Sequence, residues 1–81
     1  MSRQEILDQV VQICKDVFDN DELELTEESS AADVEEWDSL THLNLMSDIE
    51  EEFGITFKLE EITAAKNIGE LVSIIVAHLE K

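Results

Sequence analysis

Apolar residues recur at helical spacing in three separate parts of this chain, and this pattern restricts the fold more than any other feature. Residues 3 to 18 carry two adjoining apolar rows, which are Ile6, Val10, Ile13 and Val17 and then Leu7, Val11, Cys14 and Phe18. Residues 38–53 and 68–79 repeat the pattern. The chain has no proline and only two glycines, whereas β-proteins need many turns. The sequence therefore predicts an all-α fold.

Capping residues mark where the expected helices begin. Ser2 with Glu5 three residues later has the form of a capping box. Asp38 is expected to cap the second helix and Asn67 the last, which should end near Leu79. These signals define three main helices, each with its start fixed locally.

Two features are expected between the second and last helices. Gly54 directly follows the second helix and suits a helix stop that needs positive φ. The stretch "ITFKL" alternates like a strand but has no evident partner, so we expect an extended loop, followed by a short helix at Glu60 to Ala65. The predicted architecture is thus a four-helix bundle with three main helices, one short helix and a long first loop.

The longest stretch without a helical period runs from Asp19 to Trp37. Loops of this length are often functional and are held by their own apolar contacts. Four apolar residues are expected to hold it against the core: Leu23, Leu25, Val34 and Trp37. With 81 residues and one apolar core, residues 1–81 are expected to form a single domain.

The chain is strongly acidic, with 21 Asp and Glu residues against 5 Lys and Arg and a formal charge of −16. Such a charge repels nucleic acids and anionic membranes and attracts proteins that have basic patches. No segment is apolar and long enough to cross a bilayer, and the N-terminus does not resemble a signal peptide. We therefore expect a cytoplasmic protein, monomeric and without membrane insertion, that binds basic protein partners and no nucleic acid.

Metal-binding patterns are tested because the composition is acidic. A calcium loop beginning at Asp19 would place Leu23 and Ser30 at ligand positions and Glu24 where glycine is required. His42, His78 and the single cysteine do not have zinc-ligand spacing. We expect no metal site, a packed or half-buried His42, and a core position for Cys14.

The stretch "EEWDSL" places Ser39 where the second helix begins. A hydroxyl at that place is exposed, and the unpaired N–H groups and partial positive charge of a helix N-terminus suit a phosphate ester. A purely structural alternative is that Asp38 or Ser39 only caps the helix. No G-x-S-x-G elbow surrounds the serine, so no catalytic residue, and no enzyme, is expected.

The longer stretch "DSLTHLNLMSDIEEEFGI", from Asp38 to Ile55, strongly resembles the acyl carrier protein family. The resemblance extends to the helix order, the long loop before the serine and the acidic balance. It implies that Ser39 carries 4′-phosphopantetheine, transferred from coenzyme A by a phosphopantetheinyl transferase. The arm's thiol would then hold acyl intermediates as thioesters for other enzymes, and the protein itself would catalyse nothing.

The resemblance also implies which residues meet the partner enzymes. The transferase, acyl ligases, synthases and acyl transferases would bring basic patches to a docking surface made of Asp38, Leu40, Asp48, Glu50 and Glu51. Fatty-acid carriers commonly have Gly-Ala before the Asp-Ser-Leu and a docking glutamate further along the helix. Here Glu36 and Trp37 take the first two places and Asn44 the third. At these positions the chain more closely resembles carriers of specialised pathways, such as polyketide synthesis.

Two alternatives stay open from the sequence. The cargo could be an aminoacyl, peptidyl or D-alanyl group, carried on the same arm. More remotely, the chain could be an unmodified acidic adaptor that binds basic partners and leaves Ser39 bare. Fatty acid, polyketide and other specialised pathways are all compatible with the motif.

Overall fold

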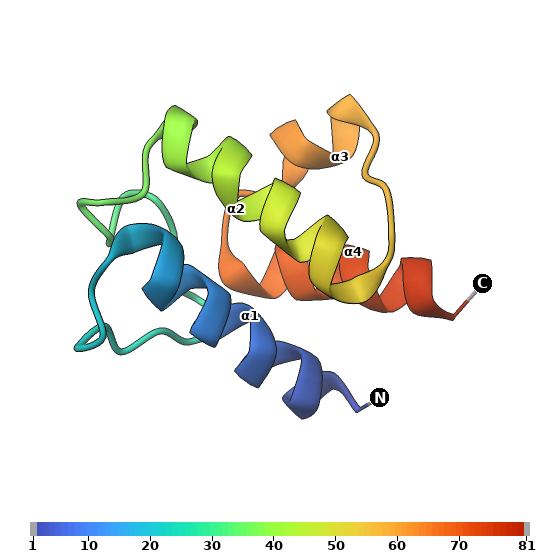
Figure 1. Ribbon diagram of the computed structural model, residues 1–81, viewed down its shortest axis with the longest axis horizontal. Helices are drawn as coiled ribbons and strands as arrows, with labels where there is room; N and C mark the ends of the chain where they lie inside the picture. The colour runs from blue at the N-terminus through green and yellow to red at the C-terminus, as the bar shows by residue number, and fades with distance from the viewer. Residues whose placement is uncertain (1, 81) are drawn as a thin grey trace.

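The computed structural model describes residues 2–80 and contains four helices (Figure 1). They are α1 (Arg3–Phe18), α2 (Ser39–Phe53), α3 (Leu59–Ala64) and α4 (Ile68–Leu79). Within the described residues the only β-type pairing is an isolated bridge between Ser30 and Asn67. The predicted all-α fold, with a long first loop and one short helix, is confirmed. No helix among these residues is long and apolar enough to span a membrane.

The helix ends lie close to where the capping signals placed them. The Ser2 hydroxyl accepts a hydrogen bond from the Glu5 N–H, and the Glu5 carboxylate accepts one from the Ser2 N–H, at 3.2 and 3.0 Å. Gly54 ends α2 with a φ of +66°. The short helix begins at Leu59 and not at Glu60, so that expectation was wrong by one residue at each end.

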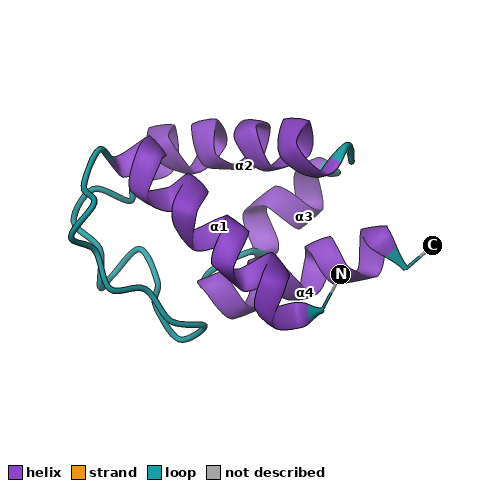
Figure 2. Ribbon diagram, turned by 60° about the horizontal axis from the view of Figure 1, so that its bottom comes forward, coloured by secondary structure: helices purple, strands orange, loops and turns teal. Residues whose placement is uncertain are grey.

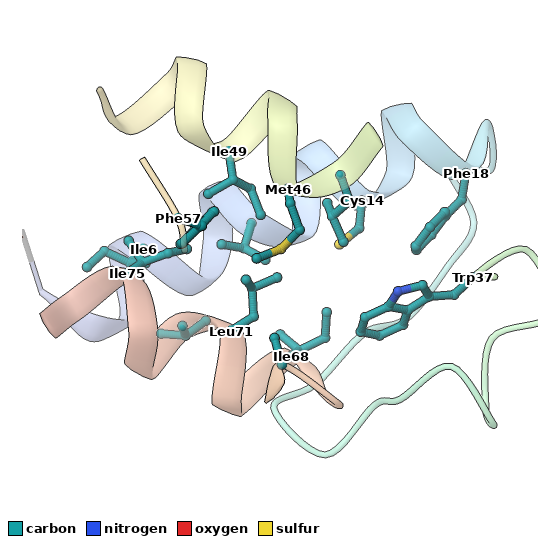
Figure 3. Packing of buried hydrophobic residues seen from close by; sticks show 14 of the residues in the cluster. Ile6, Cys14, Phe18, Trp37, Met46, Ile49, Phe57, Ile68, Leu71 and Ile75 are labelled. Atoms are coloured by element: carbon teal, nitrogen blue, oxygen red, sulfur yellow. The ribbon is translucent and has the colours of Figure 1, made fainter. Parts of the chain in front are cut away.

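Helix α1 packs against both α2 and α4, and the first loop, residues 19–38, fills one end of the molecule (Figure 2). The buried residues form one cluster, in which Cys14 is fully enclosed, as predicted (Figure 3). Burial raises the pKa of the Cys14 thiol to about 12. The loop residues Val34 and Trp37 are part of this cluster, and Leu23 and Leu25 pack against it.

The first loop is also held by polar contacts to the start of α4. The carbonyl of Ser29 accepts the N–H of Ile68 at 2.9 Å, and the carbonyl of Glu27 accepts that of Gly69 at 2.8 Å. The guanidinium of Arg3 pairs with the Glu27 carboxylate and donates to the Gly69 carbonyl at 3.2 Å. Two of the four N–H groups that a helix start leaves unpaired are thus used to fix the loop.

Helix α3 is attached differently from the other three helices, because none of its residues is fully buried. A ring nitrogen of His42, in α2, lies 2.8 Å from the Ile62 carbonyl oxygen. His78, in α4, places its Nε2 3.0 Å from the Glu61 carboxylate. Both histidines of the chain therefore reach consecutive residues of α3, and polar contacts help to set its position.

Candidate functional site

Ser39 is the first residue of α2, and its side chain is exposed. The Asp38 carboxylate accepts hydrogen bonds from the N–H groups of Leu40 and Thr41 at 3.0 and 2.9 Å. In return, the Thr41 hydroxyl oxygen accepts from the Asp38 N–H at 2.8 Å. Asp38 and Thr41 together cap the helix, so Ser39 is not needed for that task.

The same contacts define the charge beside the serine. The hydrogen bond from the Thr41 N–H lowers the pKa of the Asp38 carboxyl, with further lowering from the Thr41 hydroxyl and the Leu40 N–H. Asp38 is therefore a carboxylate at neutral pH, placed at the positive end of the α2 dipole. It gives any basic partner that approaches Ser39 an anionic contact.

An open groove of about 370 Å³ lies beside Ser39. We call it the Ser39 groove. The first loop and the start of α2 form one side through Trp37 and His42, and the end of α3 and the residues after it form the other through Ile62 and Lys66. It joins segments that are at least twenty residues apart in sequence, so only the folded chain produces it.

Two hydrogen bonds join three residues that line the Ser39 groove. The Trp37 indole N–H donates to Nδ1 of His42 at 3.0 Å. Because Nδ1 accepts, the neutral imidazole carries its proton on Nε2, which donates to the Ile62 carbonyl at 2.8 Å. This Trp37–His42–Ile62 chain connects the first loop, α2 and α3. The half-buried His42 that the sequence predicts is confirmed.

The residues expected at the docking surface differ in exposure. Asp38, Asp48 and Glu51 are exposed, and Leu40 is 69% exposed. Glu50 is half-buried, and its carboxylate accepts a hydrogen bond from the Phe57 N–H at 2.7 Å. Glu50 thereby holds the connection between α2 and α3, a contact that nothing in the local sequence indicates.

Leu43 is 54% exposed and lies one turn from Leu40 on α2. On the helical wheel of α2, Leu40 and Leu43 lie on the same apolar arc as Leu45, Met46 and Ile49, but only the last three of these are buried. The beginning of α2 therefore carries an exposed apolar pair next to Ser39. The spacing of three residues between the two leucines was the available signal for it.

Metal coordination finds no support in residues 2–80, where no three His, Cys, Asp or Glu side chains are arranged to hold an ion. His42 and His78 instead make the contacts to α3 described above. The two histidines are thus employed in packing rather than gathered at one centre.

Comparison with known proteins gives consistent matches over nearly the whole chain. Residues 8–75 match the sequence model of a family described as a phosphopantetheine attachment site. An acyl carrier protein of Rubrobacter xylanophilus is 36% identical over 78 residues, which is 96% of each chain. One from Thermotoga maritima is 34% identical, covering 91% of each.

Solved structures agree with the sequence matches. The solution structure of a holo acyl carrier protein from Geobacter metallireducens has a TM-score of 0.85 and 40% identity, over 91% of this chain and 85% of that one. An acyl carrier protein from Enterococcus faecalis has a TM-score of 0.74 and 27% identity, over 96% and 99%.

Fold and sequence match together define the class of carrier proteins that bear phosphopantetheine. Within that class, this chain belongs to the acyl carrier protein family. Its prosthetic group is 4′-phosphopantetheine, attached covalently. Members of the family are carrier proteins and not catalysts.

Proposed function

We propose that Ser39 is the residue that bears the 4′-phosphopantetheine arm. The observation that carries the proposal is the division of tasks at the start of α2, where Asp38 caps the helix and the Ser39 side chain is exposed. Ser39 also lies well inside the matched residues 8–75.

The transfer step is a substitution at phosphorus. The Ser39 oxygen forms a bond to the phosphorus that carries the pantetheine, the pyrophosphate bond of coenzyme A breaks, and adenosine 3′,5′-bisphosphate leaves. The hydroxyl proton passes to a base of the transferase. Nothing in this step requires a catalytic group of the carrier, which fits a chain that catalyses no reaction of its own.

In this function residues 1–81 form one carrier domain that acts as a monomer in the cytoplasm. The arm's thiol holds an acyl group as a thioester, and the tether raises the effective concentration of that group at each enzyme. The enzymes served belong to fatty acid, polyketide or another specialised synthesis. An aminoacyl cargo would use the same arm, and loading with aminoacyl and acyl ligases separates the two possibilities.

The docking surface for these enzymes comprises Asp38, Leu40, Asp48, Glu50 and Glu51. Its support is the exposed Leu40, the carboxylates along α2 and the net charge of −16. Partners with basic patches would be steered to it in a salt-dependent manner. Glu51→Lys tests the surface more cleanly than Glu50→Lys, because Glu50 also binds the Phe57 N–H.

The experiment for the attachment site is intact-mass spectrometry after incubation with coenzyme A and a broad-specificity phosphopantetheinyl transferase, followed by peptide mapping. We expect one added phosphopantetheine on Ser39 in the wild type, none in Ser39→Ala, and normal addition in Ser47→Ala, an exposed serine of the same helix. Modification of Ser39→Ala would place the arm elsewhere. A folded wild type that takes no arm would favour the unmodified adaptor.

A further inference from the structure

The three residues of the Trp37–His42–Ile62 chain line the Ser39 groove, and of these Trp37 also belongs to the core and Ile62 packs against it. We propose that this chain closes the route from Ser39 into the core, so that the carrier holds a short acyl group in the groove and excludes a long alkyl chain from the interior. The proposal rests on the attachment of the arm to Ser39 and adds the class of cargo.

The first part of the barrier spans the space between α2 and α3. His42 lies three residues after Ser39, and therefore on the same side of α2. Its Nε2 binds the Ile62 carbonyl of α3 at 2.8 Å. An alkyl chain that passed from Ser39 between the two helices would break this hydrogen bond and leave polar groups without partners in an apolar setting, which is costly.

The second part of the barrier is the Trp37 ring, which is 4% exposed. Its centroid lies 5.9 Å from that of Phe18 and 6.0 Å from that of His42. In Figure 3, Trp37 and Phe18 lie together at one end of the core, away from Ile6 and Ile75. The bulky pair thus fills the end of the core that borders the Ser39 groove.

Behind the barrier the core residues of α2 and α4 are closed to solvent. Leu45, Ile68 and Leu71 are 0% exposed, and Met46 is 1% exposed. Protein interiors of this kind are close-packed, so admitting an alkyl chain requires displacement of side chains. The groove itself is already open to solvent and needs no such displacement.

The volume of the Ser39 groove suits a small group. About 370 Å³ lies near the lower end of the range for small-molecule sites, roughly 300–1,000 Å³. Trp37 and Ile62 offer apolar contacts for a few carbon atoms, while Thr63 and Lys66 line the groove with polar groups. A short acyl group, with or without a polar substituent, matches this lining better than a long saturated chain.

The experiment loads the apo protein with butyryl- or dodecanoyl-phosphopantetheine from the corresponding coenzyme A thioesters and records methyl NMR spectra. In both acylated forms we expect the methyl groups of Leu45, Ile68 and Leu71 to keep the chemical shifts that they have in the unacylated holo protein, within the error of the measurement. Large shifts of these core methyls in the dodecanoyl form of the wild type would overturn the proposal.

Two variants test whether His42 forms the barrier. His42→Ala removes both hydrogen bonds of the chain, and we expect the dodecanoyl group then to shift the core methyls. A glutamine can accept from Trp37 and donate to Ile62, so His42→Gln should behave as the wild type. If the core methyls do not shift in folded His42→Ala loaded with the dodecanoyl group, another feature closes the route. That result would overturn the role proposed for the Trp37–His42–Ile62 chain. If His42→Ala does not fold, the wild-type spectra alone decide.

Intact-mass spectrometry of each sample distinguishes a failure of the proposed function from a failure of the proposed closure. A folded protein that gains no acylated arm at Ser39 contradicts the proposed function. A protein that gains the arm at Ser39 but takes the dodecanoyl group into its core contradicts only the closure by Trp37, His42 and Ile62.

Discussion

Asp38 and Ser39 are neighbours that perform separate tasks at the start of α2. The Asp38 carboxylate accepts hydrogen bonds from two backbone N–H groups, and the Asp38 N–H donates to the Thr41 hydroxyl oxygen. The Ser39 side chain is exposed and takes no part in the cap. Chemistry on the serine can therefore proceed without loss of the contacts that begin the helix.

Replacing Ser39 by alanine should leave the fold intact while removing the attachment point. Exposed substitutions away from caps and core change the free energy of unfolding by about 0.5 kcal/mol or less. Urea denaturation followed by circular dichroism checks this, and Asp38→Ala serves as the control that loses the cap and some stability. A Ser39→Ala protein as unstable as Asp38→Ala would show that the serine shares the capping task.

The Asp38 cap should weaken in acid. Hydrogen bonding lowers the pKa of the folded carboxyl below its ordinary value of 3.8. A lowered pKa means that the contribution is fully present above the unfolded pKa and is lost as pH falls through the folded pKa. The stability difference between wild type and Asp38→Ala, measured by urea unfolding, should therefore shrink below about pH 4. A difference that stays constant down to pH 2 would contradict this cause.

At the scale of elements, the start of α4 depends on a close approach to the first loop. A Cβ built on Gly69 would lie 3.0 Å from the Glu27 carbonyl oxygen and 3.2 Å from the Glu27 Cβ. The same carbonyl accepts the Gly69 N–H at 2.8 Å, so the loop cannot withdraw without losing that bond. Gly69 therefore lies at a close contact between the first loop and α4.

Gly69→Ala should therefore destabilise the protein, although alanine inside a helix ordinarily gains about 1 kcal/mol over glycine. The crowding with Glu27 is expected to outweigh that gain. Thermal unfolding measures the result, with Ala77→Ser, at an exposed position of the same helix, as a comparison for general effects of substitution in α4. A Gly69→Ala protein with a raised melting temperature would show that the loop adapts freely.

The sequence predicted those elements whose signals are local. The ends of α1, α2 and α4 follow from apolar spacing and from the caps at Ser2, Asp38 and Asn67. For α3 the expected bounds were off by one residue, because a helix with no buried residue has no apolar row to define it. Its true start is fixed by the Lys58 N–H, which donates to the Glu61 carboxylate at 2.9 Å.

The candidate site also has a part that the sequence predicts and a part that it does not. Ser39 could be proposed as the attachment residue from its motif, because that motif is contiguous in sequence. The Ser39 groove could not be found, since its sides come from segments that only the tertiary fold brings together. The contact of Glu50 with the Phe57 N–H was missed for the same reason: the acceptor lies on a helix and the donor in the loop that follows.

For the whole molecule, the net charge of −16 is distributed over a compact body with a Cα radius of gyration of 11.4 Å. Like charges this close oppose the folded state, and the repulsion is screened when the Debye length falls from about 30 Å at 0.01 M salt to about 10 Å at 0.1 M. The fold must therefore be stable enough to tolerate that repulsion.

The melting temperature should consequently rise with added sodium chloride, most steeply at low ionic strength. Differential scanning fluorimetry between 0.01 and 0.5 M salt measures the effect, and an uncharged osmolyte at matched osmolality is the control. A melting temperature that does not respond to salt would indicate that the carboxylates are too far apart to repel one another appreciably.

The burial of Cys14 affects whether an acyl group on the arm can be lost to a side reaction with the protein. The chain has one cysteine, it is fully enclosed, and its pKa is raised to about 12, so almost no nucleophilic thiolate forms at neutral pH. On a carrier loaded through Ser39, the thiol at the end of the arm would have no competitor from the protein. Thioester exchange onto the scaffold, which would strand an intermediate beyond the reach of any enzyme, is thereby suppressed.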